Sequence, residues 1–392
     1  MKNFNIDRFN LEKMKLGEQP LVLKRTSYNE PIITNGRLID ENGTAIGTKG
    51  DMYTKYIMDY ILENGTLDHN PRPHYVDFYE NATYNSLTKE ITTADGIKIP
   101  VYENDKVIKK DNGIELQVPA HTLSVNNNIE CNYDLSKGES PLITLRPIAT
   151  KASIAEILWI YQMQSNDLVE FDTLLGKNTW EENHKINNWW EDWAIRNQDG
   201  SYNLNGMGHP HIGSCYGETA RRYNILKHEV IDAIRSNPDG RRNISSLWQY
   251  SDFSEPHGLK PCAFLTVWNV RHGWDGKDYL DMILVQRSSD FATAGCINQV
   301  QYVALQKMVA KDLGLTPGTF TWKPVNIQIY DRHIDQAIEL LGREPINCSA
   351  TIEVSDSVKN FSDFKVDDVF INDYPKELIK AKNPQLKFPL GI

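Results

Sequence analysis

A single cysteine, Cys262, stands at the head of an alternating apolar run in the stretch GLKPCAFLTVWNV, residues 258–270. A free cysteine in such a place is usually a small buried hydrophobic residue. To act as a nucleophile it needs a nearby cation, because the thiolate is the attacking species. The motif QRSSD supplies Arg287 just after the next predicted strand, and a hairpin would bring Arg287 close to Cys262. A buried thiol and a nucleophile both remain possible from these residues alone.

Three further groups of residues could do chemistry. Glu156 lies in the apolar helix candidate ATKASIAEILWIYQM, where a carboxyl is usually on the solvated face but can also be an acid held in a pocket. The tryptophans of WWEDW at 189–193 are either core residues or a stacking platform for a flat ligand. Arg241 and Arg242 follow the turn NPDG, and such a pair is either solvated or projects toward a phosphate.

The elements that must position these residues follow one another without a regular βαβ repeat. Residues 1–50 are polar and turn-rich, which predicts an extension packed on a larger body. The mixed order of helices and strands predicts an α+β or irregular α/β protein. We expect helices at 51–66, 149–163 and 297–314, strands at 262–270, 279–286 and 321–330, and short β-type runs at 73–118.

The composition of the chain indicates which binding partners and which cell compartment to expect. A formal net charge of −10 argues against a nucleic-acid partner, yet it allows a local basic pocket for a small anion. The chain has no run of about 18 apolar residues, and its start MKNFNIDRFN has no secretory character, so we expect a cytoplasmic protein with no membrane partner. Five cysteines without CxxC pairs or Cys/His ligand spacing predict free thiols and no metal site.

A series of motifs, in order and with matching spacing, resembles the thymidylate synthase family. The resemblance covers about 51–72 and 119–392, so it implies a catalytic domain at 51–392 with an insertion at about 73–118. It also implies an α/β (α+β) fold, with a large bent mixed sheet, helices, and a homodimer packed sheet to sheet. The motifs are EILWIY (156–161), WWEDWA (189–194), CYGETARR (215–222), NPDGRR (237–242), PC (261–262), QRSSD (286–290), Asn298, Tyr302, IQIYDRHIDQ (327–336), GREP (342–345) and KFPLGI (387–392).

The resemblance implies a nucleotide site for dUMP. Cys262 matches the nucleophile that adds to C6 of the uracil ring, which makes C5 able to attack a one-carbon electrophile. Asn298 matches the residue that reads the base, since an amide can donate to O4 and accept from N3–H, whereas Asp would favour cytosine. The remaining substrate ligands implied are Arg287 and Ser288 for the phosphate, Arg241 and Arg242 for the phosphate in the partner subunit's site, Arg72 as a further phosphate arginine, Tyr330 for the sugar hydroxyl, and Gln328, where most members have His.

The resemblance also implies a folate site next to the nucleotide. Glu156 and Tyr216 match residues that move protons around the base. Asp290 matches a catalytic contact to the pterin, and 5,10-methylenetetrahydrofolate would be the one-carbon donor. The residues implied on the folate side are Trp190, Trp193 and the C-terminal Ile392.

Around this site the chain departs from the family pattern. Ala263 follows Cys262 where synthases carry His, ATAGCINQV at 292–300 replaces a Gly-Leu-Pro-Phe-Asn-Ile stretch, and PVNIQIY at 324–330 replaces a Gly-Gly-Asp-x-His-x-Tyr run. The motifs NPDGRR and QRSSD, which the resemblance implies bind phosphate, are kept. Nucleotide binding is therefore expected to be retained and the later chemistry to be altered.

The departures favour a relative of the synthases. Phage pyrimidine hydroxymethylases use the same thiolate addition and the same donor, but they add water to the exocyclic methylene instead of hydride. Loss of the His beside Cys262 and a remodelled wall favour water at that step. With Asn298 reading uracil, we predict a dUMP hydroxymethylase, acting in the host cytoplasm if it is of phage origin. A divergent thymidylate synthase is the alternative, and a silent nucleotide- or RNA-binding relative is a third hypothesis.

Overall fold

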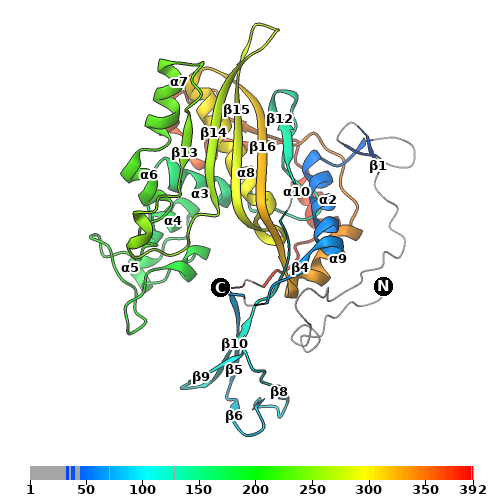
Figure 1. Ribbon diagram of the computed structural model, residues 1–392, viewed down its shortest axis with the longest axis vertical. Helices are drawn as coiled ribbons and strands as arrows, with labels where there is room; N and C mark the ends of the chain where they lie inside the picture. The colour runs from blue at the N-terminus through cyan, green and yellow to red at the C-terminus, as the bar shows by residue number, and fades with distance from the viewer. Residues whose placement is uncertain are drawn as a thin grey trace.

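The computed structural model describes residues 32–34, 37–39, 45–69, 71–126, 129–389 and 391. Most of the expected extension at 1–50, and also Ile392, lie outside these residues. A seven-stranded mixed sheet forms the centre of the molecule (Figure 1). Its strands, in spatial order, are β13 (Ile244–Ser246), β14 (Ala263–His272), β15 (Asp278–Asp290), β16 (Thr316–Tyr330), β11 (Thr122–Asn126) and β4 (Thr66–Leu67), with β12 (Cys131–Asp134) also paired to β16.

The middle of the sheet combines an antiparallel hairpin with a parallel crossover. β14 pairs antiparallel with β15, as the predicted hairpin requires. β15 pairs parallel with β16, and the helix α8 (Cys296–Leu313) makes the crossover between them. Because the two strands are parallel, their carboxyl ends lie at one edge of the sheet. The strands and the long helix expected from the hydrophobic period are confirmed to within a few residues.

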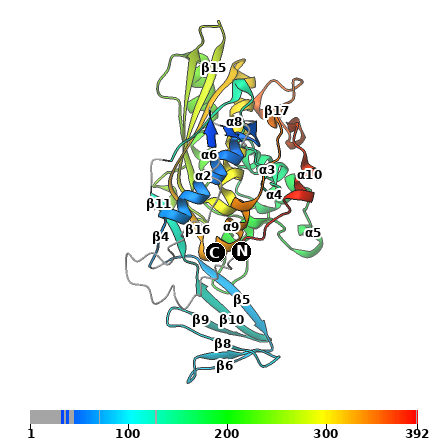
Figure 2. The same ribbon diagram turned by 90° about the vertical axis from the view of Figure 1, so that its right-hand side faces the viewer.

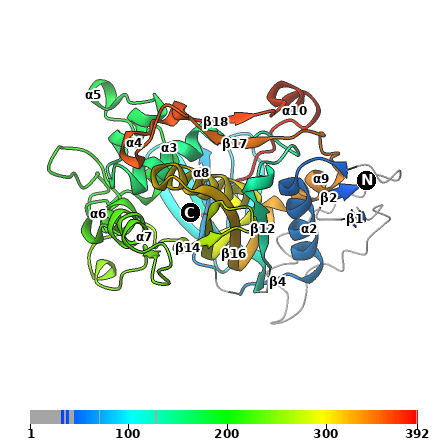
Figure 3. The same ribbon diagram turned by 90° about the horizontal axis from the view of Figure 1, so that it is seen from above.

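Helices cover one face of this sheet. Figures 2 and 3 show α3 (Thr150–Tyr161) and α8 together on that side of the molecule. Every residue of α3 from 153 to 161 is buried, so this helix has no solvated face. The side chains of Trp159, Trp268 and Trp322 are fully buried in the resulting core. A carboxyl on α3 is therefore held inside the protein, and the usual solvent-facing interpretation of Glu156 is wrong.

The remaining helices surround this centre. The α2 helix begins after Thr48, whose hydroxyl accepts from Asp51 N while the Asp51 carboxyl accepts from Thr48 N, a capping box. None of the helices in the described ranges has the length and apolar character needed to cross a membrane. The helices are α2 (Lys49–Asn64), α4 (Leu168–Leu175), α5 (Trp180–Asn183), α6 (Gly217–Tyr223), α7 (Ala233–Ser236), α9 (Ile334–Gly342) and α10 (Lys376–Lys382), with the π-helical segments η3 (Lys227–Asp232) and η5 (Phe291–Gly295).

The segment at 74–119 projects from the body as two small three-stranded sheets (Figure 1). The β-type runs expected there are confirmed, since the segment contains strands and no helix. At its root, Tyr75, Val118 and Ala120 form a small core with Tyr330 at the end of β16. The strands are β5 (His74–Glu80), β10 (Gly113–Pro119) and β9 (Lys106–Lys110) in one sheet, and β6 (Thr83–Asn85), β7 (Glu90–Thr92) and β8 (Lys98–Pro100) in the other.

Short strands outside these sheets complete the described secondary structure. They are β1 (Ile32–Thr34), β2 (Arg37–Ile39) and β3 (Ala45–Ile46) near the start of the chain, and β17 (Thr351–Val354) and β18 (Val369–Asn372) toward its end.

Candidate active site

Cys262 and Arg287 are neighbours across the β14/β15 pair. The backbone N–H of Arg287 donates to the carbonyl of Cys262 at 2.9 Å, and Nη2 lies 3.5 Å from Sγ. The guanidinium is fixed in this place because Nε donates to Pro261 O at 2.9 Å and Nη2 donates to Lys260 O at 2.7 Å. The cation that a nucleophilic cysteine needs is thus present and held by the backbone.

Two opposing effects act on the pKa of the Cys262 thiol. Burial raises its pKa above the usual value for cysteine, while the nearby charge of Arg287 and a hydrogen bond with Tyr216 act in the opposite direction. Burial is the larger effect, so the pKa is raised. In the protein without nucleotide, Cys262 is mainly a thiol, and its proton must leave as sulfur forms its bond.

Tyr216 is hydrogen-bonded to the backbone of Cys262. Its hydroxyl oxygen accepts a hydrogen bond from the backbone N–H of Cys262 at 3.1 Å, which leaves the phenolic O–H free to donate. The residue has φ 48° and ψ −107°, a strained backbone for an aromatic residue. The next position must be Gly217, because a Cβ there would lie 1.8 Å from the carbonyl oxygen of Ser165. Burial raises the pKa of Tyr216, so the phenol stays neutral.

Glu156 is buried, and both its carboxyl oxygens accept hydrogen bonds. Trp190 Nε1 donates to Oε1 at 2.7 Å, and Gln301 Nε2 donates to Oε2 at 2.5 Å. Burial raises the pKa of this carboxyl to about 7, although the donors oppose the shift. An acid with this pKa can both give and take a proton near neutral pH.

Asn298 is held by two glutamine side chains. Gln286 Nε2 donates to Asn298 Oδ1 at 3.0 Å, and Asn298 Nδ2 donates to Gln301 Oε1 at 3.0 Å. Each end of the Asn298 amide keeps one further hydrogen-bonding position, a lone pair on Oδ1 and a hydrogen on Nδ2. These are the two groups that reading of uracil by Asn298 would need.

Together these contacts form a circuit, which is closed by the backbone N–H of Cys262 and by the peptide bond between Gln286 and Arg287. Tyr216 and Trp190 join its two halves through an edge-to-face contact with ring centroids 5.0 Å apart. The circuit brings together residues that are up to 145 positions apart in the chain. In order it runs through Cys262, Tyr216, Trp190, Glu156, Gln301, Asn298, Gln286 and Arg287.

The carboxyl ends of β15 and β16 add a second row of polar side chains. Ser288 Oγ donates to Gln328 Oε1 at 3.3 Å, and Asp290 is opposite Gln328 in the strand register. Tyr330 is buried, and its ring lies edge-on to the His333 ring with centroids 5.3 Å apart. Four of the expected ligands thus share one sheet edge, as the parallel pairing requires.

Asp290 offers an acceptor that fits a folate. Its Oδ2 accepts from Thr293 Oγ1 at 2.5 Å, whereas Oδ1 is buried and has no hydrogen-bond partner among the described residues. A buried carboxyl oxygen that lacks a hydrogen bond, although it lies 3.8 Å from His333 Nδ1, suits the N–H groups of a pterin. Trp193 packs edge-on against Trp190, with centroids 5.5 Å apart, as part of an aromatic wall. The described residues contain no group of His, Cys, Asp and Glu side chains suited to a metal ion.

Three expected phosphate arginines stand apart from the circuit. Arg241 and Arg242 precede the edge strand β13 and are exposed, and neither has a hydrogen bond or ion pair within the described residues. Arg72 is also exposed, at the root of the projecting segment. Within one subunit, therefore, Arg287 is the only one of the expected phosphate arginines that contacts Cys262.

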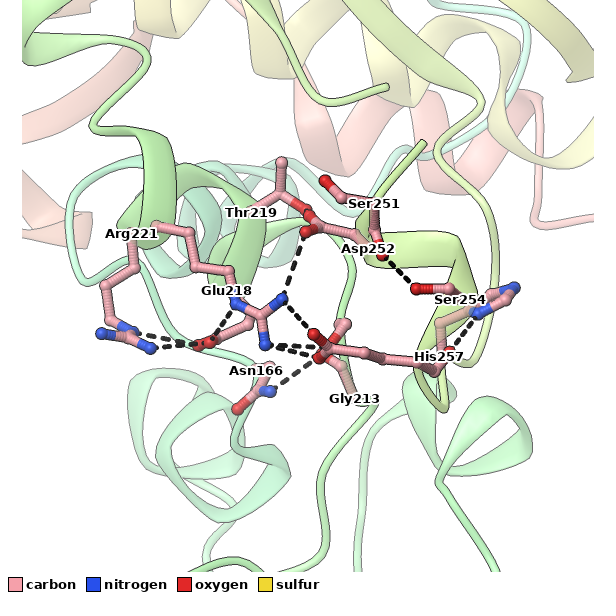
Figure 4. Close-up of polar contacts among 12 residues, drawn as sticks. Asn166, Gly213, Glu218, Thr219, Arg221, Ser251, Asp252, Ser254 and His257 are labelled. Atoms are coloured by element: carbon pink, nitrogen blue, oxygen red, sulfur yellow. Dashed lines mark hydrogen bonds and ion pairs between the residues drawn. The ribbon is translucent and has the colours of Figure 1, made fainter. Parts of the chain in front are cut away.

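A partly exposed charge cluster that sequence reasoning missed braces the loop carrying Tyr216. Arg222 donates to Glu218 at 2.9 Å, to Asp252 at 3.2 Å and to Glu255 at 2.6 Å. Figure 4 shows Glu218, Thr219 and Asp252 gathered in this cluster. The contacts tie α6 to the loop that leads into β14, so they fix Tyr216 relative to Cys262. Sequence offered no signal for the contacts of Arg222 with Asp252 and Glu255, because these partners are 30 and 33 residues away.

Gln301 and Gln286 were also missed as members of the site. Gln286 belongs to the QRSSD motif, but no role was assigned to it. Gln301 stands three residues after Asn298 on a helix that was predicted correctly, so the two side chains had to share one face. That spacing was the available signal for Gln301.

Comparison with known proteins agrees with this geometry. The family model described as thymidylate synthase matches residues 103–384. The chain belongs to the thymidylate synthase family. Thymidylate synthases of Streptococcus sanguinis (strain SK36) and Streptococcus pneumoniae (strain ATCC 700669 / Spain 23F-1) are each 44% identical over 263 residues, which is 66% of this chain and 84% of each relative.

A solved structure supports the same assignment. Thermostable thymidylate synthase A from Bacillus subtilis matches with a TM-score of 0.61 and 25% identity, covering 88% of this chain and 99% of that one. The family and the fold expected from the ordered motifs are both confirmed. The protein is thus an enzyme of a one-carbon transferase family that uses methylenetetrahydrofolate as co-substrate.

Proposed function

We propose that this thymidylate synthase family member is a dUMP hydroxymethylase. It transfers a one-carbon unit to C5 of dUMP through a covalent bond between Cys262 Sγ and C6, and then adds water. The products are 5-hydroxymethyl-dUMP and tetrahydrofolate.

The described residues can take each role in this sequence. Cys262 loses its proton and adds to C6, so the C5–C6 double bond becomes a nucleophilic carbon at C5. C5 bonds to the methylene carbon of methylenetetrahydrofolate, which is at the oxidation level of formaldehyde, and the two C–N bonds of that carbon break, so that tetrahydrofolate leaves with the electron pairs and protons on its nitrogens. After loss of the C5 hydrogen as a proton, toward the free lone pair of Tyr216 or a water that it holds, the pyrimidine carries an exocyclic methylene. Glu156 takes a proton from water, the oxygen bonds to the methylene carbon, and Sγ leaves C6 with its electron pair.

The observation that carries the proposal is Ala263. Synthases have histidine directly after the nucleophile, and here a methyl group stands in its place, with the alanine carbonyl accepting from Tyr302 Oη at 3.2 Å. Removing a large polar side chain beside the thiol changes the group that orders water there. Glu156, with a pKa of about 7, remains as a base for a water molecule.

A divergent thymidylate synthase is the second candidate. The relatives that are 44% identical carry that name, and Trp190 and Trp193 form an aromatic wall of the kind a folate needs for hydride transfer. In this case the methylene is reduced by tetrahydrofolate, and the products are dTMP and dihydrofolate.

We also infer a homodimer that shares its phosphate sites. The sheet face opposite α8 carries an apolar row of cross-strand neighbours, Ile244, Val267 and Ile283, and Ile283 is 37% exposed. Packing this face against a second copy would bury the row. Arg241 and Arg242 are exposed and have no hydrogen bond or ion pair with the described part of the chain, and they precede the strand at the edge of that face, where they could reach the phosphate bound by the other subunit.

The folate product distinguishes the two candidates. Purified protein is incubated with dUMP and methylenetetrahydrofolate, and both folates and nucleotides are separated by chromatography. Equal amounts of tetrahydrofolate and hydroxymethyl-dUMP support the proposal. Dihydrofolate formed together with dTMP establishes the synthase instead, and nucleotide binding without turnover identifies a silent relative.

A further inference from the structure

Among the residues that the structure describes, Gln301 is the one side chain that is hydrogen-bonded to both Glu156 and Asn298. It lies on α8, one turn after Asn298, and only 3% of its surface is exposed. Its Oε1 accepts from Asn298 Nδ2 at 3.0 Å, and its Nε2 donates to Glu156 Oε2 at 2.5 Å. The residue that would read the base and the acid that would move protons are therefore connected through a single amide.

Trp322, at the end of the hydrogen-bond chain that lies farthest from Glu156, determines which way each amide in the chain is turned. Trp322 Nε1, which can only donate, lies 2.8 Å from Gln286 Oε1. The NH₂ group of Gln286 must then face Asn298 Oδ1. It follows that the NH₂ group of Asn298 faces Gln301 Oε1, and that the NH₂ group of Gln301 faces Glu156. Turning any one amide over would place two NH₂ groups or two oxygens against each other.

We propose that Gln301 is a positioning residue, which holds the Asn298 amide in the sense that reads uracil and directs the proton of Glu156 toward the nucleotide. The inference deepens the proposed function and depends on it. Gln301 itself need not touch the substrate. It acts through its two neighbours, so one substitution should change base discrimination and proton transfer together.

Because Gln301 donates to Glu156, it determines which side of the carboxyl can carry a proton. A protonated Glu156 cannot donate to Gln301, because the amide presents NH₂ and cannot turn over. The proton must therefore lie on the side of the carboxyl away from Gln301. The titratable groups that face Glu156 are the phenols of Tyr216 on the loop before α6 and Tyr302 on α8, and burial raises the pKa of both, so both stay neutral. Loss of the Gln301 donor should raise the pKa of Glu156 further.

The test replaces Gln301 by Met, which keeps the length of the side chain and removes both hydrogen bonds. Gln299→Met is the matched control: Gln299 is on the same helix and equally buried, but it binds Tyr133 and Gly295 away from the site. Two quantities are measured in folded protein. They are the ratio of the dissociation constants for dUMP and dCMP, and the pH dependence of tritium release from C5 of dUMP, a step common to both candidate reactions.

For Gln301→Met we expect the preference for dUMP to fall about fivefold and the maximal rate of tritium release to fall about tenfold or more, with the Glu156-dependent limb of the pH profile moved to higher pH. Gln299→Met should leave the ratio and the profile unchanged. A Gln301→Met protein that changes neither quantity, or only one of them, overturns the inference.

A second variant separates the effect of Gln301 on Asn298 from its effect on Glu156. It also provides the test if the Gln301→Met protein fails to fold. Gln301→Glu keeps an acceptor for Asn298, so the nucleotide preference should stay within about twofold of wild type. It places a second carboxyl against Glu156, so the pH limb should move upward strongly. An unchanged profile in this variant contradicts the inference. A wild-type protein that binds neither nucleotide and releases no tritium would instead refute the proposed function.

Discussion

Arg287 holds its guanidinium 3.5 Å from the Sγ of Cys262, and the carbonyls of Lys260 and Pro261 keep it there. The same guanidinium belongs to the QRSSD motif, which we propose binds the nucleotide phosphate. One side chain can therefore connect phosphate binding to the state of the thiol. Because the backbone anchors it before any substrate arrives, little rearrangement is needed when the nucleotide binds.

The contact predicts how Cys262 reacts. Replacing Arg287 by Met removes the cation that opposes the burial effect, so the pKa of the thiol should rise further. Alkylation of Cys262 by iodoacetamide, followed by peptide mass mapping at neutral pH, should become about fivefold slower. Cys348, a partly exposed thiol whose charged neighbours among the described residues are Asp51 and Asp373, is the internal control. Equal rates at Cys262 in both proteins would contradict an electrostatic role for Arg287.

The raised pKa of Glu156 predicts that the stability of the folded protein depends on pH. Its pKa is raised from 4.5 to about 7 in the folded protein, so the folded state binds this proton more tightly than the unfolded state does. The free energy of unfolding should therefore fall as the pH rises from about 4.5 to 7, by up to about 3 kcal/mol from this residue. Glu156→Gln removes the titration. Urea unfolding across this range should show wild type losing more stability than the variant, and parallel curves would count against the assignment.

Asn298 predicts the choice of base. Asn298→Asp replaces the donor to O4 of uracil with an acceptor that suits the amino group of cytosine. The ratio of kcat/KM for dUMP to that for dCMP should fall by about tenfold or more. Asn326→Asp is a suitable control, since Asn326 lies on β16 and its side chain bonds only Asn126 among the described residues. If the ratio stays at its wild-type value in the Asn298 variant, another residue reads the base.

The shared phosphate site predicts recovery of activity in hybrid dimers. Cys262→Ser protein and an Arg241→Met, Arg242→Met double variant should each be inactive or nearly so alone. When they are mixed and allowed to exchange subunits, half of the dimers are hybrid and each contains one complete site, so about a quarter of wild-type activity should return. Failure to recover activity, with hybrid dimers shown by native mass spectrometry, would exclude sharing of the arginines.

Local pattern was enough to predict much of the scaffold. The hairpin of β14 and β15 and the long helix α8 follow from hydrophobic period and turn residues, and they already place Arg287 beside Cys262 and Gln301 beside Asn298. These relations involve neighbours in one hairpin or one helix. They can be read from spacing alone, although the role of Gln301 was not recognised in that way.

Burial and long-range partners could not be predicted in this way. Glu156 lies on a helix that is buried on every side from residue 153 to 161, so no period shows which way its carboxyl points. Its partners, Trp190 and Gln301, are 34 and 145 residues away, and only the folded chain brings them together. The Arg222 cluster has the same character, because a charge pair far apart in sequence has no local signature.

The source of the oxygen in the product tests the central claim most directly. The enzyme is run with dUMP and methylenetetrahydrofolate in water enriched in the heavy isotope of oxygen, and the nucleotide product is weighed by mass spectrometry. The account predicts hydroxymethyl-dUMP whose new hydroxyl carries the heavy isotope, with tetrahydrofolate as the second product. Formation of dTMP without the isotope, together with dihydrofolate, would contradict it.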